Sequence, residues 1–137
     1  MARHVVAEAG EIPPGGRKLV TVAGREIGVF NVNGAYHAIL NRCPHAGAAL
    51  CKGRIMPLIE ADEPGHYRVT RRGELLRCPW HGWEFDLCTG QSWCDPATVQ
   101  VKSYPVSVEP GARLAKGPYV AETFPVSVEH DYVVIEA

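Results

Sequence analysis

Cys43-Pro44-His45-Ala46-Gly47 and Cys78-Pro79-Trp80-His81-Gly82-Trp83 are the two segments around which this 137-residue sequence is organised. Each segment carries one cysteine and one histidine, only one or two residues apart, beside a proline and a glycine. Thiolates suit zinc and iron–sulfur chemistry, and imidazoles suit iron or zinc. The two segments, called box 1 and box 2 below, therefore predict a metal site with four ligands: Cys43, His45, Cys78 and His81.

The order of the ligand types within the boxes separates two kinds of metal site. Structural zinc sites usually group cysteine with cysteine and histidine with histidine. Here each box supplies one ligand of each kind. A [2Fe–2S] cluster with two cysteines on one iron and two histidines on the other takes its ligands from two such loops. We expect this cluster, and a structural zinc ion bound by the same four residues is the alternative.

The boxes resemble those of the Rieske family, which read C-x-H-x-G and C-x₂-H-G. The resemblance extends from about Val20 to the C-terminus, and residues 78–86 share a Cys-Pro-Trp-His-Gly-Trp-x-Phe-Asp run with Rieske ferredoxins and oxygenase domains of bacterial ring-hydroxylating systems. It implies that Cys43 and Cys78 bind one iron of the cluster, while His45 and His81 bind the other.

Short segments rich in β-branched and aromatic residues, separated by glycine, proline and asparagine, predict an all-β chain. Asn33-Gly34 predicts a tight hairpin turn, and Pro110-Gly111 a second turn. The expected strands are Arg3–Ala7, Lys18–Ala23, Glu26–Asn31, Tyr36–Leu40, Trp83–Asp86, Thr98–Val101, Tyr104–Glu109, Tyr119–Thr123 and Phe124–Glu136. We expect one domain, with a Rieske-type antiparallel sandwich or barrel base (1–41 and 95–137) and an inserted cluster-binding lobe (42–94).

The gap of 32 residues between His45 and Cys78 is longer than the resemblance implies for a small Rieske ferredoxin. We expect residues 56–75 to add a surface hairpin. Its expected parts are an acidic loop, a strand, a turn and a second strand that leads into box 2, at 60–65, Tyr67–Thr70, Arg71–Gly73 and Glu74–Arg77. A solvated hairpin is the simplest interpretation, and a docking surface for a redox partner is the alternative.

Residues beside the boxes determine the reduction potential that we expect for the cluster. The resemblance implies that high-potential members have a disulfide joining the boxes and two hydroxyls near the cluster. Ala48 and Trp80 stand at the disulfide positions, and Trp83 and Phe85 at the hydroxyl positions. We therefore predict a potential near the low end of the Rieske range, about −150 to +300 mV.

The remaining cysteines and aromatics near the boxes also support specific expectations. Three cysteines outside the ligand set, Cys51, Cys88 and Cys94, are expected to be reduced thiols. Gly47 and Gly82 are expected to let the backbone approach the cluster closely. Four aromatics around box 2 are expected to form an apolar jacket that limits water: Trp80, Trp83, Phe85 and Trp93.

Composition narrows the class of protein. Hydrophobic residues are 46%, charged residues 21% and the net charge is −1, which is typical of a soluble globular domain and offers no basic patch for nucleic acid. No apolar run approaches the ~18 residues of a membrane span, and the N-terminus lacks the apolar core of a signal peptide. We expect a cytoplasmic protein, and the sequence carries no signal for its oligomeric state.

These observations predict an electron-transfer protein rather than an enzyme. The four remaining histidines, His4, His37, His66 and His130, show no ligand-like spacing, so no further His-pair motif is present for the mononuclear iron that an oxygenase needs. The resemblance implies a soluble one-electron carrier between an NAD(P)H-linked flavoprotein reductase and a terminal oxygenase. An accessory Rieske subunit of an oxidoreductase complex and a zinc-stabilised binding module are the alternatives.

Overall fold

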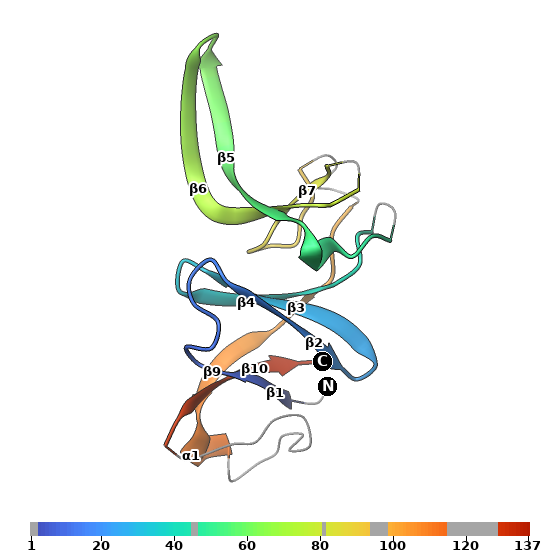
Figure 1. The fold of residues 1–137 in the computed structure, drawn as a ribbon, viewed down its shortest axis with the longest axis vertical. Helices are drawn as coiled ribbons and strands as arrows, with labels where there is room; N and C mark the ends of the chain where they lie inside the picture. The colour runs from blue at the N-terminus through green and yellow to red at the C-terminus, as the bar shows by residue number, and fades with distance from the viewer. Residues whose placement is uncertain (1–2, 45–46, 81, 94–98, 115–128) are drawn as a thin grey trace.

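The computed structural model describes residues 3–44, 47–80, 82–93, 99–114 and 129–137. Within them the regular secondary structure is almost entirely β-strand, arranged in three antiparallel sheets, as the sequence predicted. Figure 1 shows two sheets stacked at one end of the molecule and the third sheet above them, with a hairpin that projects from the body. No helix in the described ranges is long and apolar enough to cross a membrane.

The first two sheets pack face to face. The first has the order β1-β10-β9 and the second β2-β3-β4-β8. Their strands are β1 (Arg3–Glu8), β10 (Asp131–Glu136), β9 (Val106–Pro110), β2 (Arg17–Val22), β3 (Arg25–Val32), β4 (Ala35–Leu40) and β8 (Ser103–Tyr104). Alternate residues of facing strands, such as Ile27 and Val29 on β3 and Val133 and Ile135 on β10, are buried in one core. This alternation follows from the two-residue period of a strand.

The first sheet carries the chain ends and a second, smaller cluster of buried residues. β1 pairs with β10 so that Arg3 lies opposite Glu136, and the first and last strands of the chain are therefore neighbours (Figure 1). On its outer face, Val5, Tyr132 and Val134 pack with Leu114 of the short helix α1 (Gly111–Leu114). The turn expected at Pro110-Gly111 is therefore wrong, because β9 ends at Pro110 and the helix begins at the next residue.

The predicted Asn-Gly turn is confirmed. Asn33 and Gly34 both have positive φ, 52° and 97°, and they connect β3 to β4. A two-residue hairpin turn of this kind matches the twist of the strands, and asparagine and glycine tolerate the left-handed backbone that it needs. Ala23 and Gly24 connect β2 to β3 with the same sign of φ.

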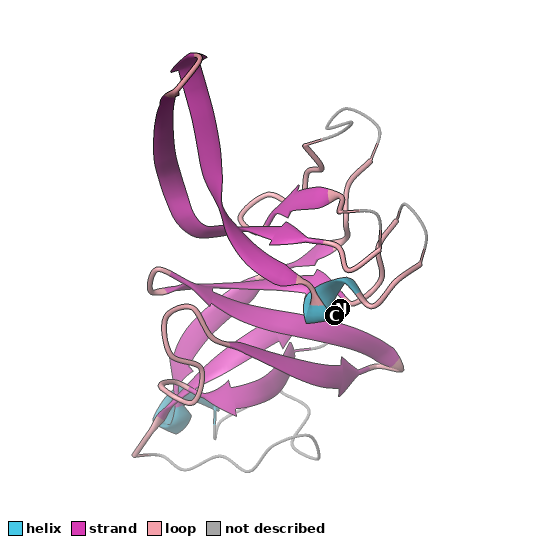
Figure 2. Ribbon diagram, turned by 45° about the horizontal axis from the view of Figure 1, so that its top comes forward, coloured by secondary structure: helices cyan, strands magenta, loops and turns pink. Residues whose placement is uncertain are grey.

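The third sheet has the order β5-β6-β7, from strands β5 (Arg54–Glu63), β6 (His66–Arg77) and β7 (Glu84–Asp86). One end of this sheet, its root, lies on the second sheet. There Leu76 and Phe85 share a buried cluster with Phe30 and Ile39. The 3₁₀ helix η1 (Leu50–Lys52), which follows box 1, belongs to the same cluster. The other end, the tip of the β5–β6 hairpin, projects away from the body in both views (Figures 1 and 2).

The hairpin turn predicted at Arg71–Gly73 is wrong, and the loop predicted at 60–65 is confirmed only for Pro64–Gly65, because residues 60–63 belong to β5. β5 continues through Glu63, and the two strands reverse at Pro64–Gly65, where Gly65 has a φ of +85°. Arg71–Gly73 lies inside β6 as a bulge, opposite a register shift between Met56 and Leu58 on β5.

The bulge explains the error. The turn was predicted from the glycine in Arg71-Arg72-Gly73, and Arg71 and Gly73 do have positive φ, 49° and 78°. A β-bulge uses the same left-handed conformation to add residues without reversing the strand. Only the pairing with the neighbouring strand distinguishes the two, and that pairing is not local in the sequence.

Two predicted strands at the C-terminal side are revised. Pro105 divides the strand expected at Tyr104–Glu109 into β8 and β9, which join different sheets, as expected of a residue that cannot donate to a ladder. Residues 99–101 of the expected Thr98–Val101 strand contribute one isolated bridge, between Gln100 and Gln91. The expected Tyr119–Thr123 strand and residues 124–128 lie outside the described residues.

Candidate metal centre

Boxes 1 and 2 form loops that close in the same way. The backbone N–H of Cys43 donates to the carbonyl of Ala48 at 2.8 Å, and that of Cys78 donates to the carbonyl of Trp83 at 2.6 Å. In each loop the donor is the predicted cysteine ligand and the acceptor lies five residues further on. The two boxes thus share the backbone hydrogen bond that closes each loop, although their histidines are spaced differently in the sequence.

Each loop has a glycine in the left-handed region four residues after its cysteine. Gly47 has a φ of +78° and Gly82 a φ of +69°. A Cβ at either position would meet only an arginine side chain, Arg42 or Arg77, at 3.7–3.9 Å, which is ordinary contact. The visible requirement for glycine is therefore conformational rather than steric, and the expected close approach of the backbone to the cluster stays a prediction.

The two predicted cysteine ligands are buried together. Cys43 is 1% exposed and Cys78 2%, and both belong to the core cluster beneath the third sheet. Burial raises the pKa of the Cys78 thiol; a hydrogen bond from the Trp80 N–H to its Sγ, at 3.4 Å, opposes this, and the neighbouring Cys43 thiol adds to it. Two adjacent buried thiols fit a bound metal, since positive charge there favours the thiolate forms.

The other two predicted ligands, His45 and His81, lie outside the described residues. The structure therefore brings together the two cysteines of the predicted set. In the described part of the chain, no group of three or more histidine, cysteine or acidic side chains is placed to hold a metal ion.

Long-range contacts fix the segment after box 1 to the base. The Arg17 guanidinium donates to the carbonyls of Cys51 and Gly53, at 2.8 and 2.6 Å. The Cys51 N–H donates to the Asn41 Oδ1 at 2.8 Å. A Cβ on Gly28 would overlap the Cys51 side chain, so glycine is needed beneath it. Burial raises the pKa of Cys51 to about 12, which keeps this thiol neutral.

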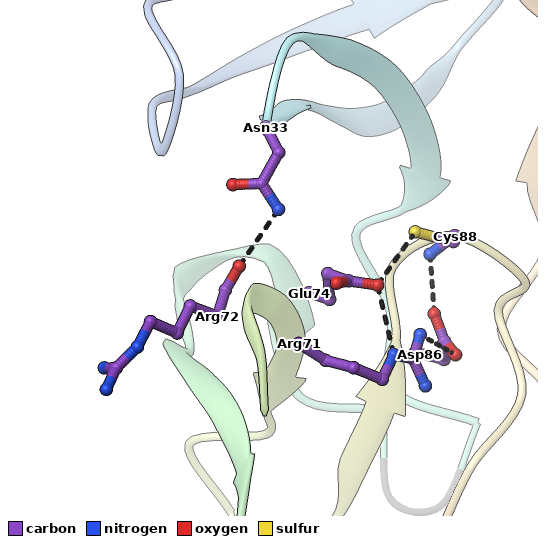
Figure 3. A network of polar contacts seen from close by, with 6 residues as sticks. All are labelled: Asn33, Arg71, Arg72, Glu74, Asp86 and Cys88. Atoms are coloured by element: carbon purple, nitrogen blue, oxygen red, sulfur yellow. Dashed lines mark hydrogen bonds and ion pairs between the residues drawn. The ribbon is translucent and has the colours of Figure 1, made fainter. Parts of the chain in front are cut away.

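An ionic network supports the segment after box 2 (Figure 3). The Arg71 guanidinium, from the β6 bulge, donates to Asp86 Oδ2 at 2.5 Å and Glu74 Oε1 at 3.0 Å. Asp86 is 7% exposed and also accepts from the Cys88 N–H at 2.8 Å. Arg71 further lies over the ring of Trp93, 5.9 Å from its centroid.

The same bulge contacts the second sheet. Asn33, in the β3–β4 turn, donates from Nδ2 to the carbonyl of Arg72 at 3.1 Å (Figure 3). The bulge thus joins the inserted hairpin to the base and to the segment that follows box 2. Sequence reasoning missed this role of Arg71, because Asp86, its partner outside β6, lies 15 residues further along the chain.

The expected jacket of four aromatics is wrong for two of them. Trp80 is 53% exposed and Trp93 47%, whereas Phe85 is fully buried and Trp83 packs against the same core. The expectation of reduced cysteines is confirmed for Cys51 and Cys88, and Cys94 lies outside the described residues.

Comparison with known proteins agrees with these observations. The family model of the Rieske [2Fe–2S] domain matches residues 2–105. The ferredoxin component of a naphthalene 1,2-dioxygenase system from Pseudomonas aeruginosa is 34% identical over 99 residues, which cover 72% of this chain and 80% of that protein. A 3-phenylpropionate/cinnamic acid dioxygenase ferredoxin subunit from Shigella flexneri is 35% identical over 98 residues, covering 72% and 78%.

Solved structures show the same fold. A chain from the complex of reduced oxygenase and oxidised ferredoxin in carbazole 1,9a-dioxygenase superposes with a TM-score of 0.59, covering 96% of this chain and 91% of that one. Its sequence identity is 23%, so this likeness supports the architecture alone.

Proposed function

The chain belongs to the Rieske [2Fe–2S] domain family, and from this premise we propose that it is a one-electron carrier of a ring-hydroxylating dioxygenase system. Its cofactor is a Rieske-type [2Fe–2S] cluster, which accepts and releases a single electron when bound. The observation that carries the proposal is the pair of matched loops that bury Cys43 and Cys78 side by side.

The proposed ligands divide by type. Cys43 and Cys78 bind one iron, and His45 and His81 bind the other. The burial of both thiols and the shared loop closure support the cysteine half of this set. The histidine half rests on the spacing within the boxes. The proposed base (1–41 and 95–137) then carries a cluster-binding lobe (42–94), whose sheet lies on the second sheet of the base.

The proposed partners are an NAD(P)H-linked flavoprotein reductase, which supplies electrons, and a terminal oxygenase, which receives them. Two relatives are ferredoxin components of dioxygenase systems, and the carbazole dioxygenase complex joins a ferredoxin to an oxygenase. The chain itself performs no catalytic step in this scheme, and its proposed location is the cytoplasm.

Reconstitution tests this function. The cluster-loaded protein is mixed with NADH and with the reductase and terminal oxygenase of the host that encodes it, and substrate hydroxylation is followed. Product formation should depend saturably on the carrier and vanish with a Cys78→Ser variant that lacks the cluster. A loaded protein that neither component reduces or oxidises would contradict the proposal, as would a chain that purifies with one zinc ion and no iron.

A further inference from the structure

The tip of the β5–β6 hairpin has one apolar face. Ile59 pairs with Val69, and Ala61 with Tyr67, so these four side chains lie on the same side of the two strands. The alternate pairs, Glu60 with Arg68 and Leu58 with Thr70, lie on the opposite side. The tip is therefore amphipathic, although it projects from the body in both views (Figures 1 and 2).

The large side chains of this face are open to solvent. Ile59 is 56% exposed, Tyr67 69% and Val69 42%, and we call these three residues the tip patch. A two-stranded hairpin is only marginally stable by itself, and apolar residues exposed together on one face are characteristic of interaction sites. The tip patch is not buried in the core, whereas apolar residues at the root, such as Leu75 and Leu76, are completely buried.

The hairpin is fixed at its root. The Arg71 guanidinium binds Asp86 and Glu74, and Asn33 binds the carbonyl of Arg72. These contacts join the hairpin to the segment that follows box 2 and to the second sheet. The tip patch is consequently held in a defined position relative to the lobe that carries the predicted cluster ligands.

The tip carries a net negative charge, which favours a partner with a positively charged surface. The sequence from Leu58 to Thr70 has three acidic residues and one arginine, a net charge of −2 in a chain whose total is −1. Glu60 forms an exposed ion pair with Arg68 at 3.4 Å, and Glu63 lies 3.9 Å from His66. A complementary surface would be apolar with basic side chains beside it.

The size of the patch argues against a stable dimer of this chain. Three partly exposed side chains offer apolar area on the order of a few hundred Å². A stable interface takes roughly 800 Å² from each partner, and electron-transfer encounters are smaller. The tip patch has the size of the apolar centre of a transient interface.

We propose that Ile59, Tyr67 and Val69 form a docking surface for a redox partner protein whose contact site is apolar and bordered by lysine or arginine. This inference rests on the proposed function and adds to it a second contact region, separate from the boxes. The hairpin's bulged root sets where the partner sits, and its acidic tip attracts the partner's basic border.

The test compares two combined variants. The tip variant carries Ile59→Ser, Tyr67→Ser and Val69→Thr, and the control variant carries Leu19→Ser and Val108→Thr, which replace similarly exposed residues of the base. Stopped-flow measurements give the second-order rate constants for electron transfer from the host reductase and to the host terminal oxygenase. The tip variant should slow at least one of them about tenfold, with unchanged midpoint potential and melting temperature, while the control should match the wild type.

Each outcome has a separate meaning. A tip variant as fast as wild type in both transfers overturns the docking surface and leaves the carrier function intact. A wild-type protein that exchanges electrons with neither partner overturns the function, and the docking surface with it. Sedimentation that shows a wild-type dimer and a monomeric tip variant would instead assign the patch to self-association.

Discussion

The root and the tip of the β5–β6 hairpin use apolar residues for different purposes. At the root, Leu75, Leu76 and their neighbour Phe85 are fully buried, and Leu76 and Phe85 pack on the second sheet. At the tip, Ile59 and Tyr67 remain more than half exposed on the same two strands. Burial of this kind is the main favourable term in folding, so the root residues are explained by stability alone. The tip residues are not, and this difference separates the fold from its interaction surface.

The largest expected effect is at box 2, next to the root. Cys78→Ser removes one of the two buried thiols and should abolish the cluster, because a hydroxyl is a poor ligand for iron in such a site. Iron content and visible absorbance measure the loss. Cys88→Ser is the matched control, since this thiol is exposed and outside the ligand set, and it should retain the iron. Full iron content in the Cys78 variant would contradict the ligand assignment.

A glycine substitution at the root should destabilise the protein more than one at the tip. At Gly53 an added Cβ would overlap the backbone carbonyl of Arg77, the residue before Cys78. Gly53→Ala should therefore lower the free energy of unfolding by about 3 kcal/mol. Gly65→Ala, in the open turn at the tip, should cost only about 1 kcal/mol, for its positive φ of 85°. Urea denaturation measures both losses of unfolding free energy. Equal losses would show that the root of the hairpin is no more tightly packed than its tip.

The ion pair at the root of the hairpin should contribute more to the free energy of unfolding than the ion pair at the tip. Arg71→Met leaves the buried Asp86 without its guanidinium partner and should cost about 2 kcal/mol of unfolding free energy. Arg68→Met removes a solvent-exposed pair with Glu60 and should change stability by less than about 0.5 kcal/mol. Thermal denaturation of the two variants decides this, and an Arg71 variant as stable as wild type would show that the network does not hold the bulge.

The smallest change in stability is expected for the charges at the tip. Glu60→Gln combined with Glu63→Gln should leave the melting temperature nearly unchanged, because both carboxylates are exposed. The electron-transfer rate to the partner should nevertheless lose part of its dependence on ionic strength, as expected when charges that steer association are removed. An unchanged salt dependence would argue that the partner does not approach the acidic tip.

Sequence reasoning identified the two boxes and predicted the all-β class and the Asn33-Gly34 hairpin turn. These features depend on local information, namely the spacing of cysteine and histidine within a loop and the backbone preference of two turn residues. The projecting hairpin was expected, but its turn was placed at Arg71–Gly73 instead of Pro64–Gly65. Gly73 is compatible with a bulge as well as with a turn, and only the register with β5 distinguishes the two.

The supporting contacts of the site could not be predicted from the sequence. Arg17 contacts the carbonyls of Cys51 and Gly53, 34 and 36 residues away, and Arg71 contacts Asp86, 15 residues away. Such pairs depend on how the sheets pack, which no local pattern reports. Exposure at Trp80 was missed for a related reason: aromatic residues are usually buried, and only the packing of the loop shows that this one is not.

A redox titration of the purified protein, followed by EPR and combined with iron and zinc analysis of the same sample, shows whether the four box residues hold a Rieske-type cluster. Trp83 and Phe85 offer no hydroxyl to the cluster. We therefore predict two irons per chain and a reversible one-electron step near the low end of the Rieske range, about −150 mV. The reduced state should give a rhombic signal. A silent spectrum from a protein with one zinc ion per chain would contradict the account.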